Sequence, residues 1–311
     1  MIPLLPLICG PTAVGKTALS LGVARALNAE IVSADSMAVY CGLEVATAKP
    51  TDEERRAVPH HLVDVVDVSE SFSVAEFHAM ASAAIDEIVG RGRLPLVVGG
   101  TRQYVEALTK GFSEAPPSDP AIRARLEGEG LPCLRPRLEA LDPLSAARLH
   151  PHDLRRTVRA LEVLELTGET ISQWQQRSRS GAPPYRRLFF GLTMDREALY
   201  DRINRRVDAM MADGLEAEVR SLLGSGRLGP TAIQGHGYKE IAGAVRGEYS
   251  LEYGVYLLKR NTRWHARHQL SWLRQQPDTI WVDVSEPGAL DRVISCIRAA
   301  SREACGAEAM G

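Results

Sequence analysis

The sequence predicts an α/β fold in which a parallel sheet, with helices on both faces, carries an inserted all-helical domain. Three observations lead to this prediction: a glycine-rich loop follows the first apolar run, further short apolar runs alternate with helical segments, and nearly ninety residues lack any strand pattern. Short apolar runs that end in small or polar residues are typical of buried parallel strands. The chain has 311 residues, 45% of them hydrophobic, which allows one large core and a smaller satellite domain.

The first predicted strand is LLPLIC, and the segment GPTAVGKT follows it directly at residues 10–17. This segment fits the phosphate-binding pattern G-x-x-x-x-G-K-[ST] at every fixed position, which makes the sheet P-loop NTPase-like. A helix is predicted to start at Lys16, so that its N-terminus offers free N–H groups and a positive dipole end to an anion. The Thr17 hydroxyl is expected to bind Mg²⁺. The expected phosphate site comprises Gly10, Pro11, Thr12, Ala13, Val14, Gly15, Lys16 and Thr17.

The other predicted strands are EIVSAD, HLVDVVD, LPLVVGG, RLFFGLTM and TIWVDV. A Walker B strand would end in an aspartate, but LPLVVGG runs into Thr101, and the available carboxylate is Asp35 after the second strand. Loops at the carboxyl ends of parallel strands line the ligand crevice, so Asp35, Thr101 and the glycine loop are expected to converge. Alternatively, Asp35 is a helix cap or an outer Mg²⁺ partner, and Thr101 bonds to backbone.

The strandless stretch carries helix signals, including an N-cap at Asp119 before Pro120 and a stop at Gly168 after LRRTVRALEVLELT. Proline pairs at 116–117 and 183–184 bracket it. We expect a catalytic core from residues 1–115 and 185–285, a helical insertion at 116–184 and a C-terminal tail at 286–311. The segments DREALYDRINRRVDAMMADGLEAEVRSLL and LEYGVYLLKRNTRWHARHQLSWLRQ are predicted to be long helices that pack back on the core.

Charge is unevenly distributed despite a net charge of −2. Residues 123–187 contain 12 Arg, no Lys and 8 acids, and residues 259–274 contain 5 Lys and Arg without an acid. This asymmetry indicates a polyanionic partner, although a solvated helix face is the alternative. Five scattered cysteines without metal-ligand spacing, and no apolar window long enough for a membrane span, favour a soluble cytoplasmic protein without a structural metal. His60 and His61 lack a third ligand and are interpreted as loop residues.

Nine segments resemble the bacterial type of tRNA dimethylallyltransferase, also called isopentenyl-tRNA transferase, of the IPP transferase family. The segment DSMAVYCGLEVATAKP is far more specific than the glycine loop. The segments run in the family's order from about residue 4 to residue 274, and they are GPTAVGKT, DSMAVYCGLEVATAKP, PHHLVDVVD, SVAEF, LPLVVGGTRQY, HPHDLRRTVRALEV, GLEAEVRSLL, GHGYKE and TRWHARHQLSWLR.

The resemblance implies transfer of a dimethylallyl group from dimethylallyl diphosphate to N6 of the adenosine 3′ to the anticodon, in tRNAs reading codons that start with U. The glycine loop would then hold a diphosphate without a nucleotide, and Mg²⁺ would be the cofactor. The insertion would bind the anticodon stem-loop of the tRNA. The protein is expected to be a monomer. Adenine N6 is a poor nucleophile, so Asp35 is expected to be the general base. Lys16, Thr101 and Arg220 are expected to stabilise the leaving diphosphate.

The resemblance also implies tRNA contacts in four stretches and at two single positions. Arginines at helical spacing occur at 155, 156 and 159 and again at 260, 263, 267 and 274, so each set forms either a phosphate-facing stripe or a solvated face. The implied contacts are Asp35, Ser36, Met37 and Ala38; Arg155, Arg156, Thr157, Val158 and Arg159; Gln234, Gly235, His236, Gly237, Tyr238 and Lys239; Arg267, His268, Gln269, Leu270, Ser271, Trp272, Leu273 and Arg274; and the single residues Thr101 and Arg123.

Several positions depart from the family pattern and are expected to tune tRNA preference. Ala38 replaces a frequent Gln, Ala46 replaces a frequent Gly, and the unusual residues are Arg102, Gln103, His236 and His268. Two other functions stay open at this point. One is a P-loop kinase with ATP in the loop and Asp35 as the base for a substrate hydroxyl. The other is a nucleotide-switched RNA-binding module without group transfer.

Overall fold

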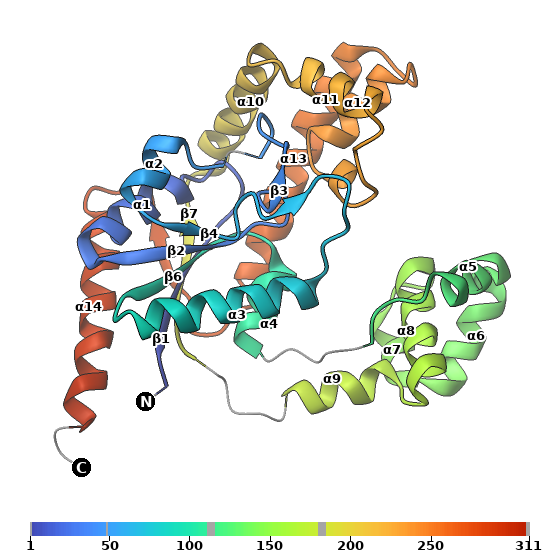
Figure 1. Cartoon of the computed structure of the whole chain (residues 1–311), viewed down its shortest axis with the longest axis horizontal. Helices are drawn as coiled ribbons and strands as arrows, with labels where there is room; N and C mark the ends of the chain where they lie inside the picture. The colour runs from blue at the N-terminus through green and yellow to red at the C-terminus, as the bar shows by residue number, and fades with distance from the viewer. Residues whose placement is uncertain (1, 48, 111–115, 180–184, 309–311) are drawn as a thin grey trace. The chain divides into compact units, whose positions relative to one another are not determined.

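A computed structural model gives the structure of the chain and describes residues 2–47, 49–110, 116–179 and 185–308 (Figure 1). The chain divides into two compact units, one made of Met1–Thr109 and Pro184–Gly311 and the other of Lys110–Pro183. The first unit contains a parallel sheet with helices on both faces, so the predicted fold class is confirmed.

The main sheet of the first unit has six strands in its described residues, all paired in parallel in the order β4-β2-β6-β1-β7-β8. In this register Gly99 at the end of β6 lies beside Cys9 on one side and Ala34 on the other. The carboxyl ends of three neighbouring strands are therefore level. The strands are β1 (Leu4–Cys9), β2 (Ala29–Ala34), β4 (His60–His61), β6 (Leu94–Gly99), β7 (Arg186–Thr193) and β8 (Ile280–Asp283).

Helices bury both faces of this sheet. On one face α3 (Val74–Gly90), α4 (Arg102–Lys110) and the end of α13 (Leu251–Leu273) pack against Leu5 and Leu7 of β1. On the other face α1 (Lys16–Leu27), α10 (Arg196–Ala212) and α14 (Ala289–Glu308) pack against Ile8. Successive side chains of a strand point to opposite faces, so burial of both faces requires the continuous apolar runs seen in the sequence.

A third hydrophobic cluster lies beside the sheet in the same unit. It joins residues 37–46 to α10, α11 (Leu215–Gly224), η1 (Ala232–Gln234), α12 (Tyr238–Val245) and α13. The long helix predicted from DREALY to RSLL is in fact two helices, α10 and α11. They separate at Gly214, whose φ of 94° lies in the left-handed region that ends helices.

Two further expectations for this unit are wrong. The run HLVDVVD is not one strand, because β4 ends at His61. The later part of the run forms β5 (Val66–Asp67), which pairs with β3 (Tyr40–Cys41). The short helix α2 (Asp52–Ala57) lies between β3 and β4 in the chain. Leu62 and Asp64 have φ values of 61° and 55°, which an extended strand cannot include. The expected tail at 286–311 contains α14, whose Val293 and Ile297 are buried in the core.

In the described residues of the second unit, all regular secondary structure is α-helical. Asp119 caps α5 as predicted, accepting hydrogen bonds from the backbone N–H groups of Ala121 and Ile122, and Gly168 ends α8 with a φ of 73°. Leu126, Leu138 and other apolar residues form a separate core. The proline pair at 183–184 lies outside the described residues. The helices are α5 (Pro120–Glu129), α6 (Leu131–Leu141), α7 (Pro143–Arg148), α8 (Leu154–Thr167) and α9 (Ile171–Arg179).

The close approach of β6 and β2 gives a test of the sheet packing. A Cβ atom at Gly99 would lie 2.2 Å from the carbonyl oxygen of Ala34. We expect Gly99→Ala to lower the free energy of unfolding by roughly 1 to 3 kcal/mol or more, measured by urea denaturation. The control is Gly90→Ala in α3, where a Cβ meets nothing within 4 Å and the change should stabilise by up to about 1 kcal/mol. Equal effects of the two changes would contradict the prediction.

Candidate active site

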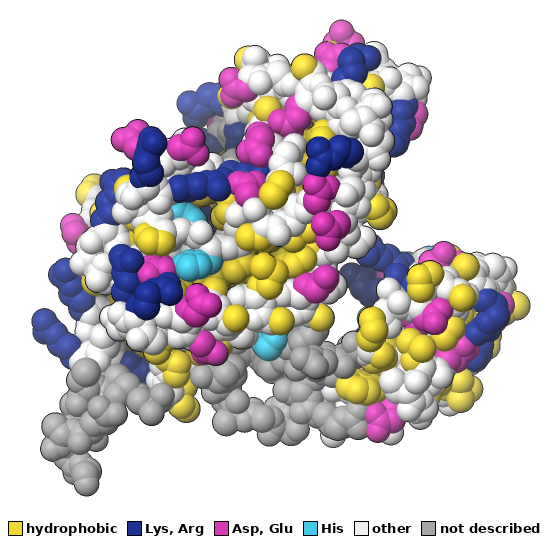
Figure 2. Space-filling model, in the orientation of Figure 1, with side chains coloured by type: hydrophobic (Ala, Val, Ile, Leu, Met, Phe, Trp, Pro, Cys, Tyr) yellow, Lys and Arg dark blue, Asp and Glu magenta, His cyan; other side chains and the backbone are white. Residues whose placement is uncertain are grey.

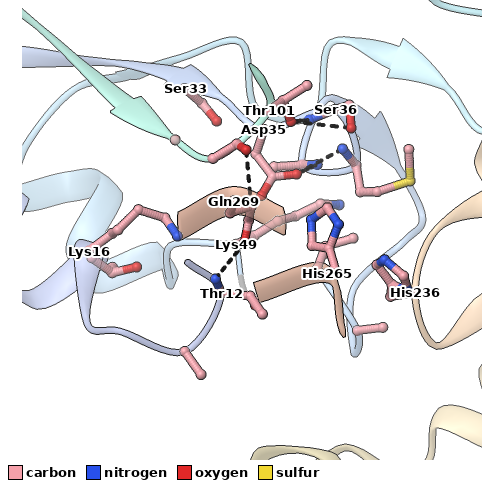
Figure 3. Close-up of a pocket in the computed structure, with 18 of the residues that line it drawn as sticks. Thr12, Lys16, Ser33, Asp35, Ser36, Lys49, Thr101, His236, His265 and Gln269 are labelled. Carbon is pink, nitrogen blue, oxygen red and sulfur yellow. Dashed lines mark hydrogen bonds between the residues drawn. The ribbon is translucent and has the colours of Figure 1, made fainter. Parts of the chain in front are cut away.

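A cavity of about 1290 Å³ opens in the first unit where β1, β2 and β6 end (Figure 3). The glycine loop, Asp35 and Thr101 all line it, so the structure brings together the three features that the strand order led us to expect. The remaining walls come from α10, from the segment around η1 and from α13.

The glycine loop is a tight turn that leaves the head of α1 open. Ala13 and Gly15 have φ values of 65° and 107°, and no side chain caps α1. The first N–H groups of a helix lack partners within it and attract anions. Lys16 Nζ donates hydrogen bonds to the carbonyl oxygens of Gly10 at 3.0 Å and Pro11 at 2.9 Å. Burial lowers the pKa of Lys16 to about 8, with the Arg206 charge acting in the same direction and Asp35 opposing it.

The Asp35 carboxylate is held by its own loop. Asp35 Oδ1 accepts hydrogen bonds from the N–H groups of Met37 at 2.9 Å and Ala38 at 3.3 Å. Thr101 Oγ1 accepts one from Ser36 N–H at 3.0 Å, and Thr101 N–H donates to the Ala34 carbonyl at 3.2 Å. Both side chains therefore make backbone contacts, which for Thr101 agrees with the alternative given above, and both border the cavity. Asp35 caps no helix in the described residues, because a turn follows it.

Arginines from α10 form a cationic wall that the sequence analysis missed. Arg202, Arg205 and Arg206 line the cavity, and Arg206 Nη2 donates to the Ala46 carbonyl at 3.3 Å. Burial lowers the pKa of Arg206, although Asp35 opposes this shift. A signal was present, because Arg202 and Arg206 lie four residues apart, each directly before a buried residue of α10.

Arg220, expected at the diphosphate, lies elsewhere. It belongs to α11, its side chain is 61% exposed, and its Nη2 contacts Glu216 Oε1 at 2.7 Å. It does not border the cavity formed by the described residues. The reason is geometric: α11 packs its Leu215 and Val219 into the third hydrophobic cluster, which turns Arg220 toward solvent.

Four histidines line the cavity, His60 from β4, His236 from the segment after η1, and His265 and His268 from α13. The rings of His236 and His265 are 4.7 Å apart, and His236 Nδ1 is 3.8 Å from Glu240 Oε1. Burial lowers the pKa of His265 to about 4, as do the charges of His236 and Lys16, while Asp35 opposes the shift. His265 is thus neutral at neutral pH. The sequence analysis noted His236 and His268 but missed His265, which lies within the segment TRWHARHQLSWLR.

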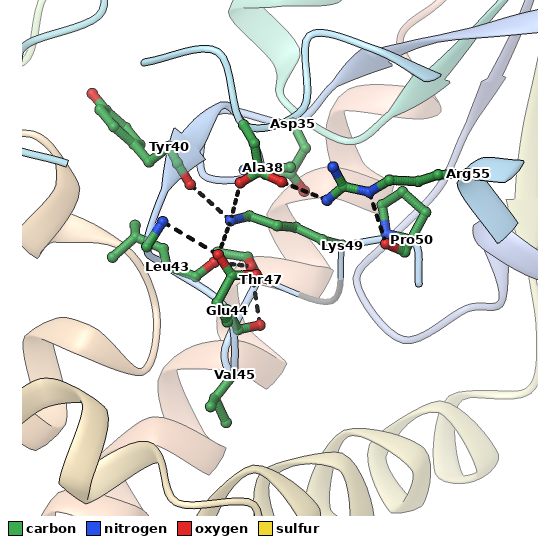
Figure 4. A network of polar contacts seen from close by, with 12 residues as sticks. Asp35, Ala38, Tyr40, Leu43, Glu44, Val45, Thr47, Lys49, Pro50 and Arg55 are labelled. Carbon is green, nitrogen blue, oxygen red and sulfur yellow. Dashed lines mark hydrogen bonds and ion pairs between the residues drawn. The ribbon is translucent and has the colours of Figure 1, made fainter. Parts of the chain in front are cut away.

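A network centred on Lys49 holds the segment that follows the Asp35 loop, and Lys49 itself lines the cavity (Figure 4). Lys49 Nζ donates to the Tyr40 carbonyl at 2.8 Å, to Glu44 Oε1 at 2.9 Å and to Asp64 Oδ1, and its side chain is only 4% exposed. Arg55 donates to the other oxygen of Asp64. Burial raises the pKa of Asp64, but hydrogen bonds from Lys49 and Arg55 outweigh it and hold the pKa below its ordinary value.

The implied tRNA contacts in the first unit separate into three groups. Ser36, Met37, Ala38, Gln234, Gly235, His236, His268, Gln269 and Trp272 line the cavity. Lys239, Arg267, Ser271 and Arg274 are exposed, and Leu270 is half-buried. Gly237, Tyr238 and Leu273 are buried, and Tyr238 Oη donates to Glu218 Oε1 at 2.6 Å, so the side chains of Tyr238 and Leu273 belong to the core.

In the second unit the implied contacts gather around α8. Glu162 is fully buried and accepts from Arg159 Nη1 at 2.7 Å and Arg123 Nε at 3.3 Å. Arg156 pairs with Asp153 at 2.5 Å, while Arg155 is exposed. Thr157 and Val158 are buried, so their side chains serve the helical core instead.

Oxygen donors suited to Mg²⁺ border the cavity near the glycine loop. Thr17, Ser33 and Asp35 all line it, and Mg²⁺ prefers oxygen ligands with phosphate oxygens completing its shell. Among the described residues no group of three or more His, Cys, Asp or Glu could hold a metal. His60 and His61 form β4, where the His60 ring contacts the Val58 carbonyl and the His61 ring contacts Glu30.

No helix in the described ranges is long and apolar enough to span a membrane.

The fold and the site define a P-loop-type α/β protein with a cation-lined cavity. The family described as IPP transferase matches residues 38–276. A tRNA dimethylallyltransferase of Geobacter metallireducens is 47% identical over 298 residues, 94% of this chain and 96% of the relative. One of Symbiobacterium thermophilum is 50% identical over 296 residues, 94% and 92% of the two chains.

Solved structures agree with these sequence relatives. The full-length tRNA isopentenylpyrophosphate transferase of Bacillus halodurans has a TM-score of 0.75 at 40% identity, covering 99% of both chains. A eukaryotic dimethylallyltransferase acting on tRNA has a TM-score of 0.79 at 29% identity, covering 90% of this chain and 74% of that one. The chain belongs to the IPP transferase family, that of the tRNA dimethylallyltransferases. It is a prenyltransferase enzyme.

The Lys49 network predicts a stability effect. Lys49→Met should lower the free energy of unfolding by roughly 2 to 3 kcal/mol, less than for a fully buried pair because Glu44 and Asp64 are partly exposed. The control Lys259→Met removes a pair with the mostly exposed Asp208 and should cost less than about 1 kcal/mol. Because the Asp64 pKa is lowered, its contribution is present above the ordinary value of 3.8 and is lost as pH falls below it. The variant should therefore lose less stability than wild type on acidification through that range, and equal slopes would contradict the assignment.

Proposed function

We propose that this chain transfers the dimethylallyl group of dimethylallyl diphosphate to N6 of the adenosine 3′ to the anticodon, in tRNAs reading codons that start with U. Relatives at 47% and 50% identity that carry the name tRNA dimethylallyltransferase support the group transferred and the tRNA substrate. The observation that carries the chemistry is that one cavity is bordered by both a phosphate loop and the Asp35 carboxylate.

The diphosphate is bound at the head of α1. Loop N–H groups, Lys16 and the guanidinium groups of Arg202 and Arg206 face the same cavity, so an anion there meets both dipoles and full charges. When the bond between the allylic carbon and oxygen breaks, its electron pair goes to the diphosphate. These cations stabilise the charge that develops on the leaving group.

Asp35 is the general base. The N6 lone pair forms the new bond to the allylic carbon, and an N6 proton passes to the carboxylate. Hydrogen bonds from Met37 and Ala38 N–H fix Asp35 Oδ1 before substrate arrives, so the acceptor needs little reorganisation. Thr101 supports the same loop through Ser36 N–H.

Mg²⁺ is the proposed cofactor, held by the Thr17 hydroxyl together with diphosphate oxygens, and it would add further charge neutralisation at the leaving group. Thr17 lines the cavity at the start of α1, which supports this position. The remaining neutralisation comes from Lys16 and Arg206 of the chain itself.

The tRNA meets the protein through exposed basic side chains. Arg155 in the helical unit, and Lys239, Arg267 and Arg274 in the first unit, are exposed. On the face seen in Figure 2, acidic and basic side chains are interspersed over the first unit, so the crowding of cations inside the cavity is a local feature. The target base has to leave its stack, which costs least in a single-stranded loop.

One reaction separates this proposal from the kinase and the switched RNA-binding module. Protein, unmodified tRNA, dimethylallyl diphosphate and Mg²⁺ are mixed, and the tRNA is analysed by mass spectrometry for one added C5H8 unit. A parallel reaction replaces the allyl donor with ATP and tests for phosphorylated product. Addition of C5H8 supports the proposal. Phosphoryl transfer would support the kinase instead, and nucleotide binding without turnover would support the RNA-binding module.

Asp35→Asn tests the general base. The amide keeps one acceptor oxygen for the loop N–H groups but does not take the proton, so the single-turnover rate should fall by about 10² to 10⁴. The affinities for tRNA and inorganic pyrophosphate should change little. The measurement is repeated at several Mg²⁺ concentrations, because a defect rescued by high Mg²⁺ would reassign Asp35 to the metal.

Arg206 and Arg220 form a matched pair for testing the leaving-group site. Arg206→Met should lower the transfer rate by roughly 10²-fold, the usual effect of removing one charge-stabilising donor. Arg220→Met changes an exposed arginine that pairs with Glu216 in its own helix and should leave the rate within about twofold of wild type. The reverse order of effects would restore Arg220 to the diphosphate site.

A further inference from the structure

Gln269 on α13 joins two of the loops that build the cavity (Figure 3). Its Oε1 accepts a hydrogen bond from Thr12 N–H in the glycine loop at 2.9 Å. Its Nε2 donates to the Gly100 carbonyl at the end of β6 at 3.0 Å. One side chain therefore spans two loops that are far from it in sequence, although the family resemblance assigns it only a contact with tRNA.

The two contacts of this position require a side chain that both accepts and donates a hydrogen bond. Thr12 N–H needs an acceptor and the Gly100 carbonyl needs a donor, so the orientation of the amide is determined by its partners. A glutamate has no donor, a lysine or arginine has no acceptor, and an asparagine is one methylene shorter. The glutamine amide supplies both the acceptor and the donor at the reach that this helix requires.

Gly100 is shaped to receive that amide. A Cβ atom at Gly100 would lie 2.4 Å from Gln269 Nε2 and 3.1 Å from the Gly10 carbonyl. Its backbone φ lies outside the left-handed region, so other residues could adopt the same backbone conformation. Glycine is needed here because a side chain would not fit beside the Gln269 amide. The glycine and the glutamine are two halves of one contact.

The contact reaches both ends of the proposed reaction. Thr12 belongs to the loop that would hold the diphosphate, and Thr101, directly after Gly100, holds the Asp35 loop through Ser36 N–H. Gln269 thus sets how far the leaving-group site lies from the general base. It also occupies the Thr12 N–H, so a diphosphate is bound by the later N–H groups of the loop and the head of α1.

We propose that Gln269 is a positioning residue that holds the diphosphate loop in register with the strand-end loops carrying Thr101 and supporting Asp35. This inference rests on the proposed transfer reaction. Small displacements of reacting groups reduce rates far more than they reduce binding. Loss of the amide is therefore expected to affect the chemical step and not tRNA affinity.

The first test compares Gln269→Ala with Gln275→Ala, an exposed glutamine just beyond the end of α13. The single-turnover rate at saturating tRNA and dimethylallyl diphosphate should fall by roughly 10- to 100-fold in the first variant and stay unchanged in the second. Affinity for an unmodified anticodon stem-loop should stay within about twofold of wild type, and the Kd for inorganic pyrophosphate should rise less than the rate falls. A stem-loop affinity that falls as much as the rate would make Gln269 a tRNA contact and overturn the proposal.

A double-mutant cycle with Gly100→Ala gives an independent test. In wild type the added methyl displaces the Gln269 amide and should slow transfer. In the Gln269→Ala background the 2.4 Å clash with the amide is gone and the 3.1 Å approach to the Gly10 carbonyl remains, so the same change should cost less than about threefold. Equal costs in both backgrounds would overturn the proposal.

Two results distinguish failure of the proposed function from failure of the role of Gln269. If wild-type protein transfers no C5H8 unit, the proposed function is wrong, and so is the role of Gln269 that rests on it. Wild-type transfer with an unimpaired Gln269→Ala variant overturns the inference alone. Thermal unfolding midpoints of all variants identify any that are unfolded at the assay temperature, in which case Gln269→Met, of similar length and without either hydrogen bond, takes its place.

Discussion

The site depends on the absence of side chains at Gly99 and Gly100, where β6 ends. At Gly99 a Cβ would lie 2.2 Å from the Ala34 carbonyl oxygen, so β2 and β6 approach as only glycine permits. At Gly100 the space of the missing side chain is filled by the Gln269 amide. Thr101 follows directly and bonds to the end of β2. Two residues without a side chain thus bring together the loop that carries Asp35, the proposed base, and the glycine loop, the proposed diphosphate site.

The parts of the site that were predictable from the sequence are those determined by neighbours in the chain or by sheet topology. The glycine loop is specified within eight residues, and Gly15 both permits the turn and precedes α1, so the start at Lys16 follows from local chemistry. The meeting of Asp35 and Thr101 follows from parallel strand ends lying at one edge. Neither prediction depends on how the helices that follow later in the chain pack against the sheet.

The failures came from contacts that local patterns do not encode. Arg206 and Arg220 have almost the same local pattern, each beside a buried valine of an amphipathic helix. The packing of α10 along the cavity, and of α11 away from it, separates the half-buried Arg206 from the exposed Arg220. Likewise HLVDVVD has the pattern of a strand, and it breaks because Asp64 turns to meet Lys49, fifteen residues earlier. Such contacts become visible only after the chain is folded.

The cavity concentrates positive charge that the fold alone would not favour. Lys16 and Arg206 both have their pKa values lowered by burial, and in Lys16 the Arg206 charge adds to the effect, so bringing these cations together has an electrostatic cost. The diphosphate of the proposed function would offset that cost, because its negative charge would favour the protonated state of Lys16. With the Lys16 pKa at about 8 in the free protein, anion binding above that pH is linked to proton uptake. The same cations that burial disfavours are thus the ones that the proposed function assigns to the diphosphate.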